Sequence, residues 1–513
     1  MATNQVTVKP DNKCWEAFQK MPPCQEACPI HMDVSGYVLA IAQGRYQDAL
    51  AIMRETNPLT AACGRVCHHP CEDVCIRGKL DEPIAIEWLK RFPGDHLGQK
   101  EAGKSNAAAR SRQEQVAVIG SGPAGLTAAH DLAKLGYGVT IFEALPVAGG
   151  MLAFGVPEFA LDRKALTSDI EYVKGLGVEI KVNHPIGTTL TLNDLRQMGY
   201  KAILVAVGAQ QALSLKMPGV ELNGVYHGLP FIKDACLGKA PSLTGKVVII
   251  GGGNVAIDAA RAALRQGASE VHVTCLESRK DMPAFWWEIE KAVQEGIKLH
   301  PSRAPKQITG KGGKVTGLDL VECKDLCTDY EGRIQPVLNE TVQESLAADA
   351  VIIAIGQTVD KSLQAADSKL KLGNRGELAC DPDTLASNLD GVFVAGDANI
   401  IRGTVTGSMA AGRKAAVNID RYLRGQPLKV MEAEGPAMEI VDARLPRFVE
   451  ARKRINMPTL AARDRIKSSQ EVDLGYQEKD AVAEARRCLT CDVCGNCMFD
   501  RAQVCFETGS RLL

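Results

Sequence analysis

Cysteine is the residue type in this sequence whose number and spacing could support chemistry. The chain of 513 residues contains 17 cysteines, and most of them gather near its two ends. The candidate metal ligands are Cys24, Cys28, Cys63, Cys67, Cys71 and Cys75 near one end, and Cys488, Cys491, Cys494, Cys497 and Cys505 near the other. In a reducing compartment, clustered thiols bind metal or take part in redox chemistry more often than they form structural disulfides. The spacing therefore predicts iron–sulfur clusters, with four-cysteine zinc sites as the alternative.

A glycine-rich turn follows a β-branched run at residues 115–119 and opens an alanine-rich stretch. The candidate cofactor-binding residues of this turn are Gly120, Gly122, Pro123, Ala124 and Gly125, and Glu143 follows about twenty residues later. The first glycine allows a tight turn, the second lets the backbone approach a pyrophosphate, and the third lets helix and strand pack closely. Glu143 ends the next expected strand, where an acidic side chain can bind ribose hydroxyls. The pattern predicts a dinucleotide-binding fold.

A second turn of the same kind lies at residues 251–256. Its candidate nucleotide-binding residues are Gly251, Gly253, Asn254 and Val255, and Ala256 replaces the third glycine, which the motif permits. Glu277 occupies the acidic position and favours the ribose hydroxyls of NADH, whereas Arg279 or Lys280 could meet the 2′-phosphate of NADPH. The choice between the two nucleotides stays open, with a modest preference for NADH. Since zinc has no redox chemistry, two dinucleotide folds in one chain also favour iron–sulfur clusters over zinc.

The order of these motifs resembles the flavoprotein reductases in which an FAD domain is interrupted by an NAD(P)H domain. Segments 204–209 and 351–356 resemble the strands that cross between the two domains, and segment 391–397 resembles the one that precedes the flavin-facing helix. The resemblance implies that Asp397 binds the ribityl chain of FAD. It also adds Gly356, Gly396 and Thr404 to the candidate cofactor-binding residues.

A narrower resemblance is to the glutamate synthase small-subunit family, and to the similar N-terminal part of dihydropyrimidine dehydrogenase. It is carried by segments 56–58, 63–67 and 70–75, and by the matches at 149–152 and 282–284. The resemblance implies an oxidoreductase that moves a hydride between NAD(P)H and FAD and passes single electrons to [4Fe-4S] clusters. It also implies that Gly150 and Met151 contribute to the FAD site.

The cysteine pattern departs from that family at both ends of the chain. Members open with Glu-Ala-x-Arg-Cys-x-x-Cys before the Cys-Pro step, but here only Cys14 precedes Cys24, and segment 484–491 reproduces the opening at the other end. One interpretation is an extra C-terminal [4Fe-4S] cluster at an exit toward a partner. The other is that Cys488 and Cys491 fold back and complete an N-terminal cluster. Two or three clusters are therefore expected, and a C-terminal zinc ribbon is a further alternative.

The expected fold class is α/β, with two Rossmann-like dinucleotide-binding domains between a helical iron–sulfur domain and a small cysteine-rich tail. The expected domains are 1–100 (N-terminal iron–sulfur), 114–243 and 346–427 (two parts of the FAD domain), 244–345 (NAD(P)H domain), 428–483 (extension) and 484–513 (C-terminal iron–sulfur segment).

The composition excludes some classes of function. Lys and Arg number 60 and Asp and Glu 61, and the resulting net charge of −1 excludes a general polycation for nucleic acid. No apolar run approaches the roughly 20 residues that cross a bilayer. The start of the sequence lacks the apolar core of a secretory signal, so we expect a cytoplasmic protein without a membrane span.

No serine–histidine or paired-carboxylate arrangement is present, so no residue is expected to act as a general acid, base or nucleophile. The central cysteines Cys236, Cys275, Cys323, Cys327 and Cys380 are isolated or spaced unlike redox disulfide pairs. Iron–sulfur clusters are therefore the expected exit for electrons. The expected partners are a nicotinamide dinucleotide and another redox subunit of a hetero-oligomeric complex. The alternative is the glutamate synthase small subunit itself, feeding a glutamine-dependent large subunit, against which the C-terminal cysteines argue.

Overall fold

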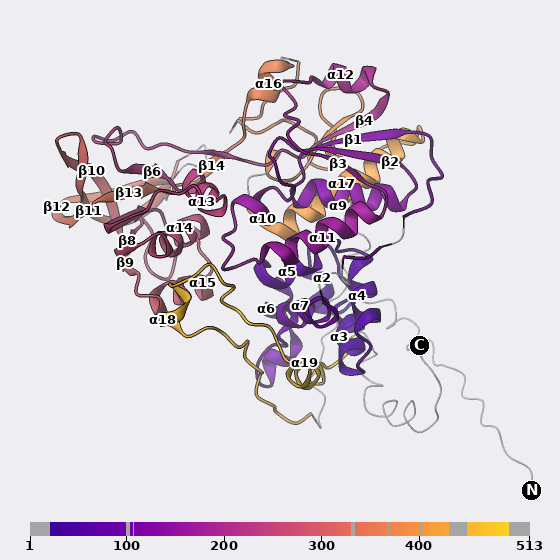
Figure 1. Cartoon of the computed structure of the whole chain (residues 1–513), viewed down its shortest axis with the longest axis horizontal. Coiled ribbons are helices and arrows are strands. Elements are labelled where there is room, and N and C mark those ends of the chain that lie inside the picture. Colours follow the sequence, from indigo (N-terminus) through magenta and orange to yellow (C-terminus); the bar gives the residue numbers. More distant parts are fainter. Residues whose placement is uncertain are drawn as a thin grey trace, which may run out of the picture.

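The chain forms a helical N-terminal domain, two α/β domains and a C-terminal segment that runs along the others (Figure 1). The computed structural model describes residues 21–98, 103–105, 107–329, 334–367, 369–374, 376–399, 403–429 and 449–491. Both α/β domains are built on parallel sheets, which confirms the predicted fold class. Among the described residues, no helix is both long enough and apolar enough to cross a membrane.

The N-terminal domain consists of short helices joined by the turns that carry the cysteines. Its helices are α2 (Pro23–Glu26), α3 (Val34–Ala42), α4 (Tyr46–Arg54), α5 (Thr60–Val66), α6 (Pro70–Asp73), η1 (Ile76–Lys79) and α7 (Ile86–Leu97). Pro23 and Pro70 occupy the first turns of α2 and α6, where a missing backbone N–H costs no intrahelical hydrogen bond. The Asp33 side chain accepts a hydrogen bond from the Gly36 backbone N–H at 2.8 Å and caps α3, which packs against α4 and α7.

The first α/β domain contains a five-stranded sheet in the order β15-β4-β1-β2-β3. Its elements are β1 (Gln115–Ile119), α9 (Pro123–Lys134), β2 (Gly138–Phe142), α10 (Met151–Phe154), α11 (Arg163–Gly175), β3 (Glu179–Lys181), α12 (Leu192–Gln197), β4 (Tyr200–Val205), α16 (Ser362–Ala366), β15 (Val392–Val394), η2 (Gly396–Ala398) and α17 (Val405–Leu423). Strand β1 is buried along residues 116–119, as expected for a parallel strand covered on both faces. Helices α9 and α17 can approach closely because Gly412 has no Cβ. A Cβ at this position would lie 2.3 Å from the Ala124 carbonyl oxygen.

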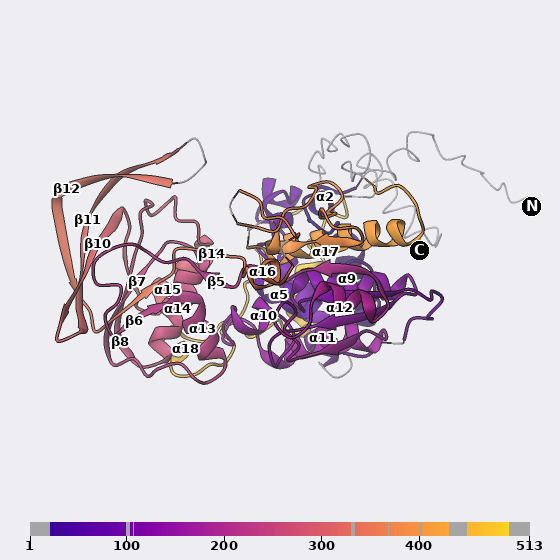
Figure 2. The ribbon, with the colours of Figure 1, turned by 90° about the horizontal axis from the view of Figure 1, so that it is seen from above.

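The second α/β domain contains a five-stranded sheet in the order β6-β13-β7-β8-β9 and a three-stranded antiparallel sheet. Its elements are β6 (Val225–His227), α13 (Gly228–Cys236), β7 (Gly245–Ile250), α14 (Asn254–Arg265), β8 (Ala268–Thr274), α15 (Trp286–Gln294), β9 (Lys298–His300), β10 (Arg303–Lys311), β11 (Lys314–Thr328), β12 (Ile334–Ala347) and β13 (Ala350–Ile353). Apolar residues of β10 and β11 pack against β7 and β13. Figure 2 shows the antiparallel sheet at the end of the molecule farthest from α9 and α17.

The strand pairing moves the boundaries of the second domain away from the expected residues 244 and 345. Strands β6 and β13 lie outside that range, yet Val351 pairs in parallel register with both Val225 and Val248. The second domain therefore extends from β6 to β13. The sequence motif predicts only the strand before the glycine turn, β7. Which strands pair with β7 depends on the tertiary structure. Two short antiparallel strands, β5 (Gln211–Ala212) and β14 (Gln357–Thr358), link the two domains.

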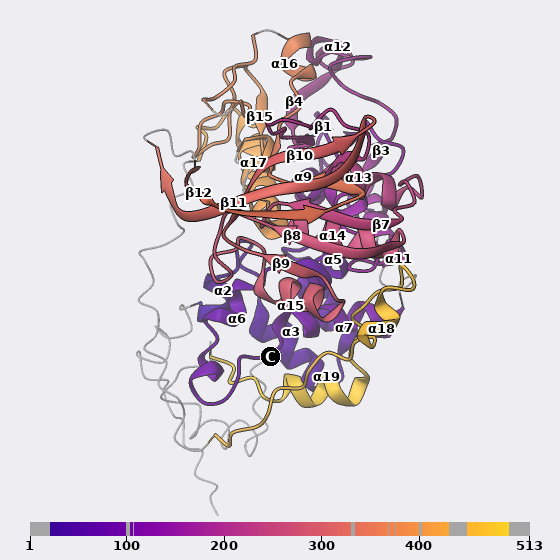
Figure 3. The ribbon, with the colours of Figure 1, turned by 90° about the vertical axis from the view of Figure 1, so that its left-hand side faces the viewer.

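The C-terminal segment, residues 449–491, ties the second domain to the N-terminal domain. It contains α18 (Ala462–Arg465), which lies beside α15 in Figure 1, and α19 (Glu478–Ala485), which packs against α3 and α7 (Figure 3). Arg465 donates a hydrogen bond to the Gln294 side chain at 3.0 Å, on the second domain. Glu471 forms ion pairs with Arg65 at 2.6 Å and with Arg91 at 2.9 Å, on the N-terminal domain. The segment therefore fixes these two domains relative to each other.

A buried carboxylate joins the N-terminal domain to the first α/β domain. Asp169 of α11 accepts hydrogen bonds from the backbone N–H groups of Ala61 at 3.1 Å and Ala62 at 2.9 Å, in the first turn of α5. Burial raises the pKa of Asp169 to about 6, although the two amides oppose this shift. Because α5 contains Cys63 and leads to Cys67, this contact sets the position of both thiols.

Substitution of Asp169 by alanine is expected to destabilise the interface between these two domains. Asp169→Ala leaves the buried N–H groups of Ala61 and Ala62 without acceptors, which should lower the free energy of unfolding by about 2 kcal/mol. The matched control is Asp162→Ala, because Asp162 also accepts two backbone N–H bonds, at the less buried start of α11. Thermal unfolding midpoints compare the two variants, and an equal loss in both would contradict the special role of Asp169.

Candidate functional site

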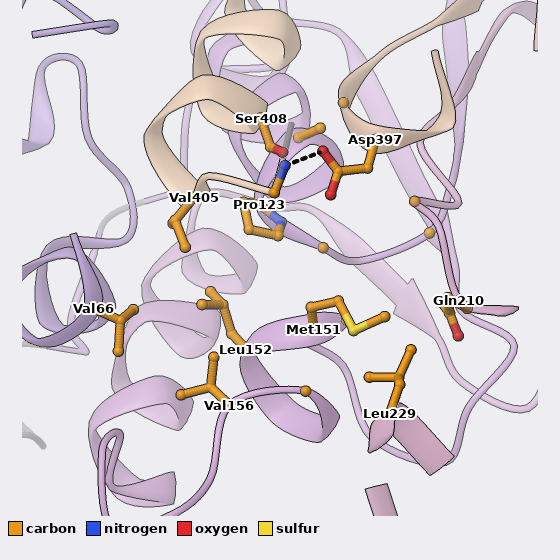
Figure 4. A pocket seen from close by; sticks show the side chains of 18 of the residues that line it. Val66, Pro123, Met151, Leu152, Val156, Gln210, Leu229, Asp397, Val405 and Ser408 are labelled. Carbon is orange, nitrogen blue, oxygen red and sulfur yellow. Dashed lines mark hydrogen bonds between the residues drawn. The ribbon is translucent and has the colours of Figure 1, made fainter. Parts of the chain in front are cut away.

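A cavity of about 520 Å³ lies where the N-terminal domain, both α/β domains and the C-terminal segment meet. The predicted cofactor-binding residues that line it are Gly120, Gly122, Pro123, Ala124, Glu143, Gly150, Met151, Asn254, Val255, Gly396, Asp397 and Thr404. Those that lie outside its lining are Gly125, Gly251, Gly253, Glu277, Arg279 and Gly356. Figure 4 shows Val66 and Gln210 at opposite sides of this cavity, with Met151 and Leu152 between them. The first predicted nucleotide turn and the two residues that follow the glycines of the second turn thus line one shared space.

The first glycine turn has the geometry that a bound pyrophosphate requires. A Cβ on Gly125 would lie 2.0 Å from the Gly120 carbonyl oxygen, so this glycine is needed for close packing of α9 on the turn. Gly120 has a φ of +102°, in the region that favours glycine. By contrast, a Cβ on Gly122 would meet no atom of the described chain within 4 Å. The open space beside Gly122, at the N-terminus of α9, fits a phosphate group.

The acidic residue after β2 is held next to this turn. One carboxylate oxygen of Glu143 accepts hydrogen bonds from the Ser121 backbone N–H at 3.0 Å and from its hydroxyl at 2.5 Å. The other oxygen accepts a hydrogen bond from the Leu145 backbone N–H at 2.9 Å. Gly150 closes over the same turn, since its Cβ would lie 2.7 Å from the Gly122 Cα. Glu143 and Gly150 therefore both lie beside the first glycine turn.

A second helix N-terminus, that of α17, faces the same cavity near the start of α9. Asp397 accepts a hydrogen bond from the Gly403 backbone N–H at 3.4 Å, and Thr404 caps α17 by accepting a hydrogen bond from the Gly407 backbone N–H at 3.3 Å. Figure 4 shows Asp397 and Ser408 close to Pro123 of α9. Two helix N-termini, a carboxylate and an apolar wall form a site that fits a bound FAD.

The second glycine turn repeats the geometry of the first. A Cβ on Gly251 would lie 2.2 Å from the Ala354 carbonyl oxygen, whereas a Cβ on Gly253 would meet no atom of the described residues within 4 Å. Asn254 accepts a hydrogen bond from the Phe285 backbone N–H at 2.9 Å and holds the following loop over α14. The turn therefore leaves room for a second nucleotide beside Gly253.

The carboxylate of Glu277, at the acidic position, lies next to the second turn. A Cβ on Gly252 would lie 2.8 Å from a carboxylate oxygen of Glu277. Arg279 forms an ion pair with Glu290 at 2.7 Å, and Lys280 is exposed. The charge beside the turn is therefore negative, which suits ribose hydroxyls better than a 2′-phosphate.

Aromatic and histidine side chains that the sequence did not single out join the N-terminal domain to the second α/β domain at the cavity. The rings of Phe285 and Trp287 stack with centroids 4.8 Å apart, and His69 contacts Trp287 at 4.4 Å. Against the effect of burial, Glu87 raises the pKa of His69 to about 9, and the two side chains pair at 3.0 Å. These contacts depend on tertiary packing, so no sequence motif predicts them.

Four cysteines form an inner group beside the cavity: Cys28, Cys63, Cys67 and Cys71. Burial raises the pKa values of Cys63, Cys67 and Cys71, and the neighbouring thiol of Cys28 adds to this effect at each of them. Cys67 lines the cavity, and the Cys63 sulfur lies 3.4 Å from the sulfur of Met409 in α17. The inner group therefore adjoins the predicted flavin site.

An outer group consists of Cys24, Cys75, Cys488 and Cys491, which line one smaller cavity. The predicted ligands Cys494, Cys497 and Cys505, and also Cys14, lie outside the described residues. Within the described ranges, no three His, Cys, Asp or Glu side chains converge closely enough for a single metal ion. The four thiols around this smaller cavity match the number of ligands that one [4Fe-4S] cluster takes.

The five central cysteines take no part in the cavity. In the part of the chain that the structure describes, Cys67 is the one cysteine among the lining residues. The thiol nearest to the predicted flavin site therefore belongs to the iron–sulfur domain. A cavity that the first dinucleotide turn shares with Asn254 and Val255 of the second, with cysteine groups beside it, defines an NAD(P)H- and FAD-dependent iron–sulfur oxidoreductase.

Comparison with known protein families agrees with this class. Residues 114–418 match the family described as pyridine nucleotide-disulphide oxidoreductase. Residues 2–102 match the family described as dihydropyrimidine dehydrogenase domain II, 4Fe-4S cluster. The chain belongs to the pyridine nucleotide-disulphide oxidoreductase family. The predicted FAD, nicotinamide nucleotide and [4Fe-4S] cofactors are thereby confirmed as classes.

Individual relatives confirm the narrower resemblance. The chain is 40% identical over 499 residues, 91% of this chain and 70% of the relative, to the NADP(+)-dependent formate dehydrogenase subunit beta of Moorella thermoacetica. It is 34% identical to the NADPH-Fe(3+) oxidoreductase subunit beta of Geobacter sulfurreducens, over 91% of this chain and 75% of that protein. It is 31% identical to the glutamate synthase [NADPH] small chain of Azospirillum brasilense, over 81% of this chain and 89% of that protein.

A solved structure shares the fold of the central region. FprA of Mycobacterium tuberculosis in complex with NADPH matches with a TM-score of 0.53 and 19% sequence identity. The match covers 61% of this chain and 85% of FprA. The arrangement of two dinucleotide-binding domains therefore recurs in a protein of low sequence identity.

Substitution of Gly122 or Gly253 by alanine is expected to weaken nucleotide binding at one site and leave the other site intact. Gly122→Ala should fold normally but lose at least about tenfold in FAD affinity, because its methyl group occupies the space beside the phosphate-binding turn. Gly253→Ala should retain FAD but bind nicotinamide nucleotide about tenfold more weakly, for the same reason. Flavin absorption and nucleotide titration measure the two effects, and each variant is the control for the other. Loss of FAD from both variants would contradict the assignment.

A buried lysine is expected to tune the inner cysteine group. Lys90 is 3% exposed and donates a hydrogen bond to the Cys63 carbonyl oxygen at 3.2 Å. Although burial opposes it, the thiols of Cys67, Cys63 and Cys71 raise the pKa of Lys90, which keeps the ammonium charged. A positive charge stabilises the more negative, reduced form of a cluster.

Lys90→Met should therefore lower the reduction potential of the inner cluster, by about 60 mV or about 1.4 kcal/mol. The control is Lys134→Met at the exposed end of α9, which should leave the potential unchanged. Electron paramagnetic resonance during a redox titration measures the midpoint. A potential that rises or stays constant in Lys90→Met would contradict the role of this charge.

Proposed function

We propose that this chain is the nicotinamide-dependent subunit of a larger redox complex. In this role a hydride moves between NAD(P)H and FAD, and single electrons pass through [4Fe-4S] clusters to or from a partner subunit. The observation that carries the proposal is the place of Cys67, a residue of the iron–sulfur domain, in the wall of the cavity that the first glycine turn shares with Asn254 and Val255 at the start of α14. Bound FAD supplies the exchange between two-electron and one-electron chemistry at this point.

The chain's own residues bind the cofactors, orient them and exclude water from the cavity. Met151, Leu152 and Val156 give the cavity an apolar wall, and the N-termini of α9 and α17 provide N–H groups for anionic parts of a cofactor. No side chain has to transfer a proton in this role. The protein's contribution is position and electrostatics.

The outer cysteine group is the proposed point of contact with a partner. Its members Cys24, Cys75, Cys488 and Cys491 are half-buried, whereas the inner group is buried. Two of the relatives carry beta-subunit names and match 91% of this chain, against 81% for the glutamate synthase small chain. This supports a subunit of another redox complex over the glutamate synthase subunit itself. We also infer a cytoplasmic location, because clustered thiols of this kind are typical of reducing compartments.

We propose NADH as the preferred nucleotide, although the three relatives above carry NADP or NADPH names. The carboxylate of Glu277 lies beside the second turn and would repel a 2′-phosphate. The charge of the nearby Arg279 is paired with Glu290.

Anaerobic titration of the purified chain with NADH and with NADPH tests the proposal. NADH should bleach the flavin at a lower concentration than NADPH, and reduced-cluster resonance signals should follow. Glu277→Gln should reduce the preference for NADH over NADPH by about tenfold, equivalent to about 1.4 kcal/mol. The control is Glu221→Gln, at an exposed position, which should leave this preference unchanged. No bleaching with either nucleotide would overturn the proposed function, whereas a preference for NADPH would overturn only the choice of nucleotide.

A further inference from the structure

We infer that Cys24, Cys75, Cys488 and Cys491 together bind one [4Fe-4S] cluster, so that the two ends of the chain share a single site. The matched iron–sulfur family covers residues 2–102 and reaches neither Cys488 nor Cys491. The inference deepens the proposed function and rests on it for the role of the cluster in electron transfer. The existence of the site is tested separately, by counting iron.

The four thiols line one small cavity between α2, η1 and the end of the C-terminal segment. The remaining wall is mostly apolar and includes Val34, Val38, Ile84 and Ile86. An apolar shell around four cysteines limits the access of water, as is usual around redox clusters. The cavity therefore has both the donors and the surroundings that a cluster needs.

The thiols influence one another electrostatically. Burial raises the pKa of Cys24, and the thiols of Cys488, Cys75, Cys71 and Cys491 raise it further. For Cys75, burial also raises the pKa, but the backbone amides of Ile84, Arg77 and Gly78 oppose the shift and favour a thiolate.

The C-terminal cysteine loop repeats a turn that is found in the inner group. Thr490 has a φ of +46°, and its backbone N–H donates a hydrogen bond to the Cys488 sulfur at 3.5 Å. His69 has a φ of +39°, and its backbone N–H donates to the Cys67 sulfur at 3.3 Å. In both loops a residue in the left-handed region turns its N–H toward the thiol two positions earlier. Such hydrogen bonds to sulfur are among the features that set cluster potentials.

A buried ion network fixes the backbone just before Cys488 on the N-terminal domain. The Arg487 guanidinium is 2% exposed and pairs with Asp81 at 2.9 Å and with Glu484 at 2.6 Å. Arg77 in turn donates a hydrogen bond to the Arg487 carbonyl oxygen at 2.8 Å. The position of Cys488 is therefore determined by contacts with residues near η1, the element that follows Cys75.

The second anchor is the carboxylate of Glu484 in α19. This side chain is fully buried and accepts hydrogen bonds from the backbone N–H groups of Ala85 at 3.0 Å and Ile455 at 2.9 Å. Burial of an ion pair is costly unless every polar group is satisfied, as it is here. The Glu484 and Arg487 pair thus holds the C-terminal segment at the site where its thiols complete the cluster.

Eight cysteines of the inner and outer groups are enough for two clusters with four thiolates each. The competing arrangement assigns Cys488 and Cys491 to a separate C-terminal cluster with later cysteines. Three full-length variants distinguish the two arrangements: Cys24→Ser with Cys75→Ser, Cys488→Ser with Cys491→Ser, and all four together. Each is purified and reconstituted without oxygen, and its iron, sulfide and cluster resonance signals are measured.

A shared site predicts that each double variant loses about four irons per chain and the same resonance signal, and that the quadruple variant loses no more. Additive losses of about eight irons in the quadruple variant would overturn the inference. Cys236→Ser with Cys380→Ser is the control and should retain all iron. Flavin bleaching by nicotinamide nucleotide should persist in every variant. Its loss would count against the proposed function, while the iron counts alone decide the shared site.

Alkylation of the wild-type holoprotein provides a measurement that does not depend on the folding of variants. The four thiols should be protected from iodoacetamide together and become reactive together when a chelator removes iron. Mass spectrometry of the peptides reports each cysteine. Reaction of Cys488 and Cys491 while Cys24 and Cys75 stay protected would overturn the inference.

Discussion

The carboxylate of Asp169 is the contact on which the position of the iron–sulfur domain against the first α/β domain depends. It accepts two backbone hydrogen bonds from the start of α5, and that helix carries Cys63 and leads to Cys67. A buried carboxylate is costly, but its two amide donors are groups that would otherwise have no intrahelical partner. The same contact therefore satisfies the helix and aligns the inner cysteine group with the cavity.

The C-terminal segment forms similar charged contacts with the N-terminal domain and with the second α/β domain. Glu471 pairs with Arg65 and Arg91 of the N-terminal domain, while Asp473 pairs with Lys291 of the second α/β domain at 3.0 Å. Charged contacts of this kind contribute less to stability than to the choice of one relative arrangement. Since electron transfer between separate groups requires fixed distances, such an arrangement suits a chain that places its redox sites in different domains.

The sequence predicted the local backbone geometry of the two glycine turns. Gly122 and Gly253 face open space, while Gly120, Gly125 and Gly251 are in close backbone contacts, as the motif requires. The expected domain limits at 244 and 345 did not match the sheet, because β6 and β13 pair within the second domain. Lys90, Asp169 and Trp287 were not predicted, because each acts through a neighbour that is distant in the sequence.

The sequence by itself determined which residues can do chemistry. Glycine turns and cysteine spacings are local patterns, and local backbone geometry is encoded over a few residues. Only the tertiary structure decided which thiols lie around one cavity. It brings Cys488 and Cys491 beside Cys24 and Cys75 through the buried Arg487 and Glu484 contacts, which join segments at opposite ends of the chain. Burial and pairing of charges depend on the whole fold, so no local spacing rule could have chosen between the two arrangements of the C-terminal cysteines.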